Sequence, residues 1–179
     1  MSITEQITTA VPTGTWQIDL VHSSVGFEVP YMGLAKFSGE VKDFDATLTD
    51  GHLIGAARIA SVVTKDENLE THLLSPEFFD AERFPEVKFA AEDVTQNGDK
   101  IEVVGEVTLK GVTQPATLHG TITGPVTDPY GREKIALKLE TTIDRTEFGI
   151  TWNAPMPDGS NALSNEVTLK ADLILVAQV

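Results

Sequence analysis

The sequence predicts an all-β fold, an extended eight-stranded antiparallel barrel with one short helical segment. Apolar and polar residues alternate with a period of two through most of the chain from Trp16 onward. Turn signals rich in Gly, Asn and Asp separate the alternating runs, and a single Leu- and Phe-dense segment at about 68–80 breaks the pattern. Such alternation places one face of each strand in a core and the other in water, as antiparallel sheets do.

Several runs carry apolar side chains on one face and charged or small polar side chains on the other. Their apolar residues, in chain order, are Trp16, Ile18 and Leu20; Val25, Phe27 and Val29; Ile101, Val103, Val107 and Leu109; Ile135, Leu137, Leu139 and Ile143; Val167, Leu169, Leu173 and Leu175. The turns between runs are expected at Thr49–Gly51, Gln96–Asp99, Lys110–Gly111 and Asp128–Gly131. The apolar phase slips by one residue between Val41 and Phe44, which predicts a β-bulge.

The segment 68–80 is predicted to be a helical crossover that covers one mouth of the barrel. Leu69, Leu73 and Leu74 fit one helical face, and Ser75–Glu77 is typical of the N-cap and first turn of a second short helix. The two phenylalanines that follow, Phe78 and Phe79, are too apolar for an exposed helix, so at least one is expected to point into the barrel.

Composition and charge argue against several classes of function and of site. The formal net charge of −14 disfavours nucleic acids and anionic membrane surfaces, and the absence of cysteine excludes disulfides and thiolate metal sites. Residues 1–13 are polar and are expected to form a flexible tail before one domain at 14–179. The opening residues lack a secretory signal pattern and no run is long enough to span a bilayer, which predicts a cytoplasmic protein without stable membrane insertion.

No catalytic, metal or cofactor motif emerges from the sequence. The histidines at 22, 52, 72 and 119 are not spaced as metal ligands on one element, and nucleotide-binding glycine loops are absent. Asp19, His22 and Ser23 lie close together, but a catalytic triad is assembled by the fold rather than by adjacency, and these residues are expected to satisfy a strand end. We therefore predict neither an enzyme nor a cofactor or metal site.

Small residues interrupt the apolar faces near the middle of several strands, at Gly39, Gly55, Ala57, Gly105 and Gly120. They are consistent with a lumen kept open for a ligand, because a barrel of about eight strands can hold one small ligand. They are equally consistent with strands that bend where a sheet curls into a barrel. The sequence does not separate the two interpretations.

The chain resembles the YceI-like family of bacterial polyisoprenoid-binding, lipocalin-like proteins from Gly14 to its end. The segments that carry the resemblance are Thr15–Asp19 with His22 and Ser23; Phe37–Gly39 with Phe44; His72–Asp80 with Phe84–Phe89; Gly105–Thr113; and Ile143–Ile150. The resemblance implies a lipocalin-like barrel around an apolar tunnel, a bound isoprenoid lipid, no enzymatic activity and a homodimer. Leu69 and Glu70 depart from it, since members often carry Arg-Asp there.

These observations favour a carrier or reservoir that holds a long-chain isoprenoid, because each buried methylene stabilises the bound state by about 0.8 kcal/mol. A small hydrolase or isomerase is the alternative, and it requires a pocket that contains His72 with Asp80 or Glu77. A solid barrel that acts as an interaction module is the third hypothesis. The residues expected to line the tunnel are Phe27, Val29, Phe37, Val41, Ile59, Phe78, Phe79, Phe89, Val103, Val107, Leu137, Leu139, Phe148 and Trp152.

The head group of the ligand is expected to be neutral, as in an isoprenyl quinone. The chain has few arginines, Leu69 stands where relatives often carry one, and the net charge opposes a diphosphate. The head-group candidates are His22, Ser23, His72, Arg145 and Asn153. An anionic head becomes the better hypothesis if Arg145 or Arg83 turns inward, because a buried charge needs a partner.

Overall fold

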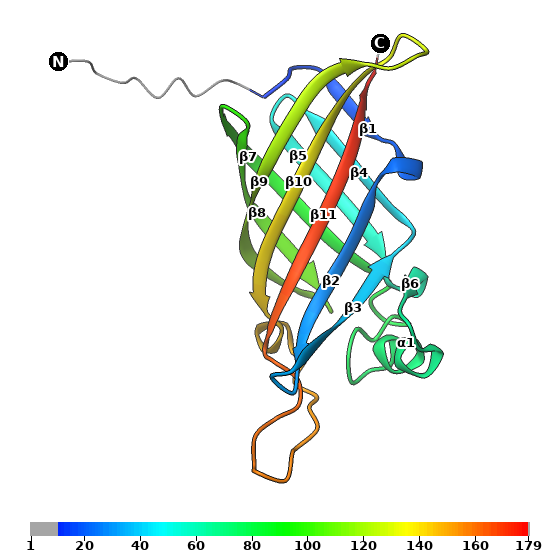
Figure 1. Ribbon diagram of the computed structural model, residues 1–179, viewed down its shortest axis with the longest axis vertical. Coiled ribbons are helices and arrows are strands. Elements are labelled where there is room, and N and C mark those ends of the chain that lie inside the picture. Colours follow the sequence, from blue (N-terminus) through cyan, green and yellow to red (C-terminus); the bar gives the residue numbers. More distant parts are fainter. Residues whose placement is uncertain (1–10, 179) are drawn as a thin grey trace, which may run out of the picture.

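The computed structural model describes residues 11–178, which form one antiparallel β-barrel (Figure 1). The strands are β1 Thr15–Ile18, β2 Ser24–Tyr31, β3 Ala35–Val41, β4 Phe44–Thr49, β5 His52–Arg58, β6 Val62–Val63, β7 Glu86–Asn97, β8 Lys100–Leu109, β9 Val112–Thr127, β10 Glu133–Asp144 and β11 Glu166–Ala177. The helices are α1 Glu67–Leu74 and the 3₁₀ turns η1 Leu20–His22, η2 Ile59–Ser61 and η3 Arg145–Phe148.

The barrel closes because β1 pairs with both β4 and β11, in the ring β1-β4-β5-β7-β8-β9-β10-β11. Strands β1 and β2 are separated by η1, and β2 also pairs with β11, so the two form one long strand. In the same way β3 and β4, separated by a break between Val41 and Phe44, form a second long strand, because β3 pairs with β2 as β4 pairs with β1. The segments therefore make eight long strands, as the alternation predicts. The break after Val41 falls where the phase slip predicts an irregularity.

Most turns lie where the sequence places them. Asp50 and Gly51, and likewise Lys110 and Gly111, adopt left-handed conformations, as tight hairpin turns require. The turn expected around Asn97 and Gly98 lies one residue later, because Asn97 is the last residue of β7 and pairs with Lys100.

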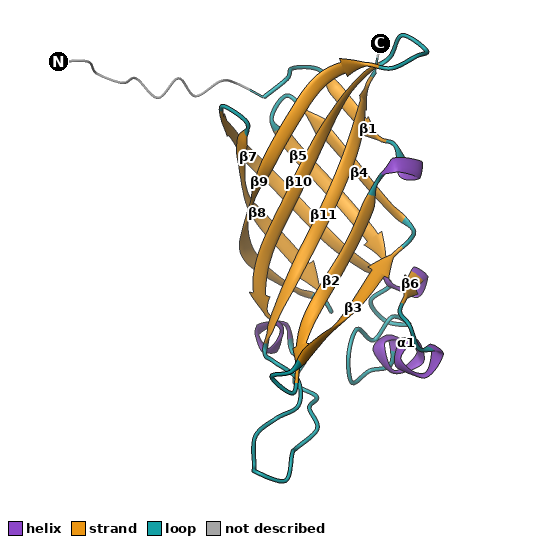
Figure 2. Ribbon diagram, in the orientation of Figure 1, coloured by secondary structure: helices purple, strands orange, loops and turns teal. Residues whose placement is uncertain are grey.

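The helical segment is shorter than the predicted range 68–80. Asp66 caps α1 by accepting hydrogen bonds from the N–H groups of Asn68 and Leu69, and the helix ends at Leu74 (Figure 2). The second helix predicted from Ser75 does not form. Hydrogen bonds from Phe78 N and Asp80 N to Ser75 O make tight turns instead, and the left-handed φ of 50° at Asp80 ends them. This difference arises because local hydrogen bonds within the turn replace the helical ladder.

The interior of the barrel divides into two halves along its axis. The half near both described chain ends, at the top of Figure 1, is packed around side chains with almost no exposure, among them Leu48, Val103, Leu137 and Leu175. We call it the closed half. The other half lies toward α1 and η3 and surrounds a cavity, and we call it the hollow half. The wall of this cavity also includes residues of the first core cluster, such as Phe44 and Leu53, where the two halves meet.

The N-terminal boundary can be followed only in part. Residues 1–10 of the predicted tail 1–13 lie outside the described residues. Val11 is buried and belongs to the core of the closed half.

Candidate functional site

The hollow half contains an apolar cavity with a volume of about 190 Å³. This volume far exceeds the ~10–15 Å³ that a single water molecule needs. The cavity follows β11 from Val167 to Leu173, a stretch of about 20 Å at ~3.3 Å per residue. Its walls come from every long strand of the barrel and from the segment after α1, so the closed sheet and its cover together define its shape.

Most of the residues predicted to line a tunnel do line this cavity. These are Phe27, Val29, Phe37, Val41, Ile59, Phe78, Phe79, Phe89, Val107 and Leu139. Four other predicted residues do not line it. Val103 and Leu137 are fully buried in the packed core of the closed half, and Phe148 and Trp152 pack in the layer beyond the cavity near η3. The predicted tunnel therefore occupies only part of the barrel, since large side chains fill the rest.

Side-chain size on the inward faces explains where the cavity lies. Gly55, Ala57 and Ala171 belong to its wall, and their small side chains leave space that leucines fill elsewhere. Other small residues allow close contact with atoms of a neighbouring strand. A Cβ atom on Gly120 would collide with the Lys138 carbonyl of the neighbouring strand, and one on Gly39 would lie 2.5 Å from the Phe27 ring. Both interpretations of the small residues thus hold, at different positions.

The segment after α1 forms the cover of the cavity. Phe78 and Phe79 line it together with Leu73 of α1, which confirms that the two phenylalanines face the barrel although they lie in turns. The Phe79 ring meets the Phe27 ring edge-on, with centroids 5.9 Å apart. Aromatic contacts of this kind stabilise packing beyond area burial alone, so the cover is held on the hollow half by specific contacts.

His72 and Glu77 lie outside the cavity wall. His72 Nε2 is 2.5 Å from Glu77 Oε2, and its ring packs edge-on against Phe78 and Trp152 with centroids 4.7 Å away in each case. The pair that an enzyme was predicted to need is therefore formed, but the Glu77 side chain is 56% exposed and neither residue lines the pocket.

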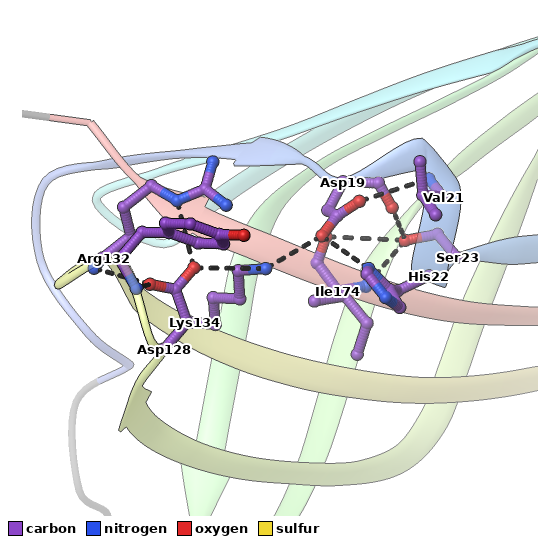
Figure 3. A network of polar contacts seen from close by, with 9 residues as sticks. Asp19, Val21, His22, Ser23, Asp128, Arg132, Lys134 and Ile174 are labelled. Atoms are coloured by element: carbon purple, nitrogen blue, oxygen red, sulfur yellow. Dashed lines mark hydrogen bonds and ion pairs between the residues drawn. The ribbon is translucent and has the colours of Figure 1, made fainter.

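His22 and Ser23, two head-group candidates, lie on the outside of the closed half (Figure 3). His22 Nδ1 is 2.9 Å from Asp19 Oδ2, and the Ser23 hydroxyl donates to the Asp19 carbonyl at 2.6 Å. The Ser23 oxygen also accepts from the Ile174 N–H of β11. These residues fasten the η1 break to the sheet, as expected for a strand end, and do not line the cavity.

The same network continues to the β9–β10 loop through Lys134, whose ammonium lies 3.0 Å from Asp19 Oδ2 and 3.4 Å from Asp128 Oδ2 (Figure 3). Burial alone would raise the pKa of Asp19, but hydrogen bonds from His22 and Lys134 outweigh it and hold that pKa below its usual value. Backbone and side-chain donors of Arg132, with the Tyr130 N–H, lower the pKa of Asp128 to about 2. The network stabilises charged carboxylates on the outer surface.

Asn153 is a structural residue of the 149–165 loop. Its side-chain nitrogen donates to the Leu163 carbonyl at 2.7 Å, and its side-chain oxygen accepts from the Leu163 and Ala154 N–H groups. These three hydrogen bonds fix the side chain within the loop, and it does not line the cavity.

Arg145 is the head-group candidate that belongs to the cavity wall. It follows β10 directly, is 4% exposed, and burial lowers the pKa of its guanidinium. The sequence signal was the Ile143–Ile150 segment, which marks the position but not the direction of the side chain. Thr141, on the inward face of β10, also lines the cavity and was missed. A single hydroxyl in an apolar alternation carries no distinctive pattern.

Within residues 11–178, no cluster of three or more His, Cys, Asp or Glu side chains is arranged to hold a metal ion. Nor does any helix of that part of the chain have the length and hydropathy required to cross a bilayer. The predicted cytoplasmic location and homodimer stay predictions.

Comparison with known proteins gives a family match. Residues 16–175 match the family model described as a YceI-like domain. The protein YceI of Salmonella arizonae is 31% identical over 137 residues, which cover 73% of this chain and 72% of that relative. The protein YceI of Salmonella heidelberg matches to the same extent.

Solved structures share the fold at lower identity. BcnA of Burkholderia cenocepacia superposes with a TM-score of 0.72 at 18% identity, covering 88% of this chain and 98% of BcnA. A polyisoprenoid-binding domain from Saccharophagus degradans, implicated in plant cell wall breakdown, gives a TM-score of 0.69 at 12% identity, with 91% and 98% covered. At such identities the likeness concerns the fold.

Proposed function

We propose that this chain, which belongs to the YceI-like family, holds the tail of a long-chain isoprenoid amphiphile in its cavity as a carrier or reservoir. The observation that carries the proposal is the apolar cavity of about 190 Å³ in the hollow half, walled by aliphatic and aromatic side chains. The fold shared with a polyisoprenoid-binding domain supports the same class of ligand. An isoprenyl quinone is a suitable first ligand to test.

Burial of the isoprenoid tail supplies enough free energy to hold the ligand. Each methylene moved from water into the cavity contributes about 0.8 kcal/mol, so one isoprene unit of five carbons contributes up to ~4 kcal/mol when fully buried. A ligand held in this way needs no catalytic group. The His72–Glu77 pair lies outside the cavity wall, so the geometry favours binding over the alternative of an enzyme that acts on a hydrophobic substrate.

The test is a tail-length series of isoprenyl alcohols, measured by calorimetry with the full chain. We expect the affinity to rise steeply with each isoprene unit until the cavity is full, and then to level off. Native mass spectrometry of the purified protein, followed by lipid extraction, identifies the co-purified ligand. An affinity that is independent of tail length, or turnover of the alcohol into a product, would contradict the proposal.

A further inference from the structure

The guanidinium of Arg145 is held rigidly at the cavity wall by three main-chain carbonyls. Nε donates to Ser164 O at 2.9 Å, and Nη1 donates to Ile150 O at 3.0 Å and to Trp152 O at 2.8 Å. These acceptors all come from the loop that follows η3, so the plane of the guanidinium is fixed before any ligand arrives.

The third nitrogen of this guanidinium, Nη2, donates no hydrogen bond to the described part of the chain. Arg145 Nη2 is the only buried side-chain nitrogen or oxygen within residues 11–178 that lacks a hydrogen-bond partner. A buried donor without an acceptor costs the full desolvation penalty of the group, and the cost is greater when the group is charged. The unpaired donor belongs to Arg145, which is a residue of the cavity wall.

The charge of the group is offset in part by the neighbouring Asp144 carboxylate, but without direct contact. Arg145 forms no ion pair within the part of the chain that the structure describes, and the Asp144 carboxylate next to it accepts hydrogen bonds from Thr146 instead. An arginine does not escape the cost by deprotonation, because its guanidinium stays protonated in proteins. The hollow half therefore contains one fixed positive charge and one unused nitrogen that offers two N–H donors.

We propose that Arg145 Nη2 binds the head group of the ligand and that this head is a carboxylate, as in a long-chain isoprenoid or fatty acid. The inference rests on the proposed function, since the tail occupies the same cavity. A carboxylate supplies an oxygen acceptor for Nη2 and places one negative charge in contact with the positive guanidinium. It also reverses the expectation of a neutral head, which assumed that no arginine faces the interior.

Other head groups fit this site less well. A quinone carbonyl or an alcohol can accept a hydrogen bond from Nη2 but leaves the buried guanidinium without an anion in direct contact. A diphosphate carries more than one negative charge, and the cavity wall offers no second inward cation for it. Lys88 and Lys170 belong to the wall, but their side chains are 64% and 45% exposed and pair with Glu86 and Glu28.

The test compares three ligands with one tail: geranylgeranoic acid, its methyl ester and geranylgeranyl diphosphate, bound to the full chain at neutral pH. We expect the acid to bind about 10- to 100-fold more tightly than the ester, because a charge-assisted hydrogen bond distinguishes them. The preference should change little with salt, since a buried pair is screened weakly.

Two variants locate the effect. Arg145→Gln should abolish the preference for the acid while binding of the ester persists, and Arg83→Gln, which changes a 74% exposed arginine, should leave the preference intact. If Arg145→Gln fails to fold because its carbonyl partners are lost, the comparison of acid with ester in the unaltered chain still decides the question.

The possible failures are distinct. Equal affinity for acid and ester, with both bound tightly, would overturn the carboxylate assignment and leave the proposed function standing. Tighter binding of the diphosphate than of the acid would overturn it too. Failure of all three ligands to bind would refute the proposed function together with the inference.

Discussion

The closed and hollow halves of the barrel are built from the same strands and differ only in what fills them. On β10, Leu137 and Leu139 are two residues apart, point to the same side and are both buried. Both belong to the same packed core cluster, but only Leu139 also borders the cavity. Strand alternation therefore decides which residues point inward, and the size of the side chains that face them decides whether a cavity remains.

The largest expected effect comes from truncating these two leucines. Leu137→Ala should lower the free energy of unfolding by about 3–5 kcal/mol, because it removes packing from a filled site and leaves a new cavity. Leu139→Ala should cost only about 2 kcal/mol, since one side of that leucine already faces empty space. Denaturant unfolding of both variants without ligand measures the difference.

Ligand affinity is expected to rank the same two variants in the opposite order to stability. Leu139→Ala should weaken the binding of an isoprenyl alcohol, and Leu137→Ala should leave it nearly unchanged in the folded protein. Equal losses of stability for the two variants would mean that the closed and hollow halves are packed alike, and the comparison would fail.

A second pair of variants adds volume instead of removing it. Ala91→Phe in the closed half should destabilise the protein by about 1–3 kcal/mol, because Ala91 is 3% exposed and has no space beside it. Ala57→Phe in the cavity wall should change stability by less than ~1 kcal/mol and reduce ligand affinity at least tenfold. Thermal unfolding and calorimetry on each variant give the two readouts. A folded Ala57→Phe variant with full affinity would place the ligand elsewhere.

The fold was predictable from the sequence because period-2 alternation and turn residues are local signals. The phase slip before Phe44 and the turn at Lys110 and Gly111 were both visible in the chain. The extent of the cavity could not be predicted from the sequence. Val103 and Val107 lie on the same face of β8, and only the residues opposite them, which the sequence does not reveal, place one in the core and the other at the cavity.

The candidate site was predictable to a similar degree. Phe78 and Phe79 could be assigned to the cover from their hydrophobicity alone, since their exposure would be costly. The direction of Arg145 could not, because it depends on carbonyls of a loop up to 19 residues later in the chain. His22 and Ser23 were suggested as head-group ligands by their polarity, but the strand break at η1 uses them locally.

The smallest expected effect concerns the polar network on the outside of the closed half. The pKa of Asp19 is lowered in the folded protein, so its charge stabilises the fold above the pKa of the unfolded chain, near 3.8. That contribution is lost as the pH falls through the lower, folded value. Asp19→Asn keeps the cap of η1, because asparagine caps helices as well as aspartate does. It removes the charge together with the Oδ2 acceptor that His22 and Lys134 use.

We expect Asp19→Asn to be less stable than the unaltered chain by about 0.5–1 kcal/mol near neutral pH, with the difference closing below about pH 4. Thermal unfolding as a function of pH, at low and high salt, measures it, and salt should reduce it because the network is partly exposed. Asp172→Asn is the matched control, since Asp172 is exposed on β11 and forms no ion pair within residues 11–178. A difference that persists unchanged at pH 3 would mean that Asp19 contributes through its hydrogen bonds alone, and the closed half would then gain nothing from the charge of its outer surface.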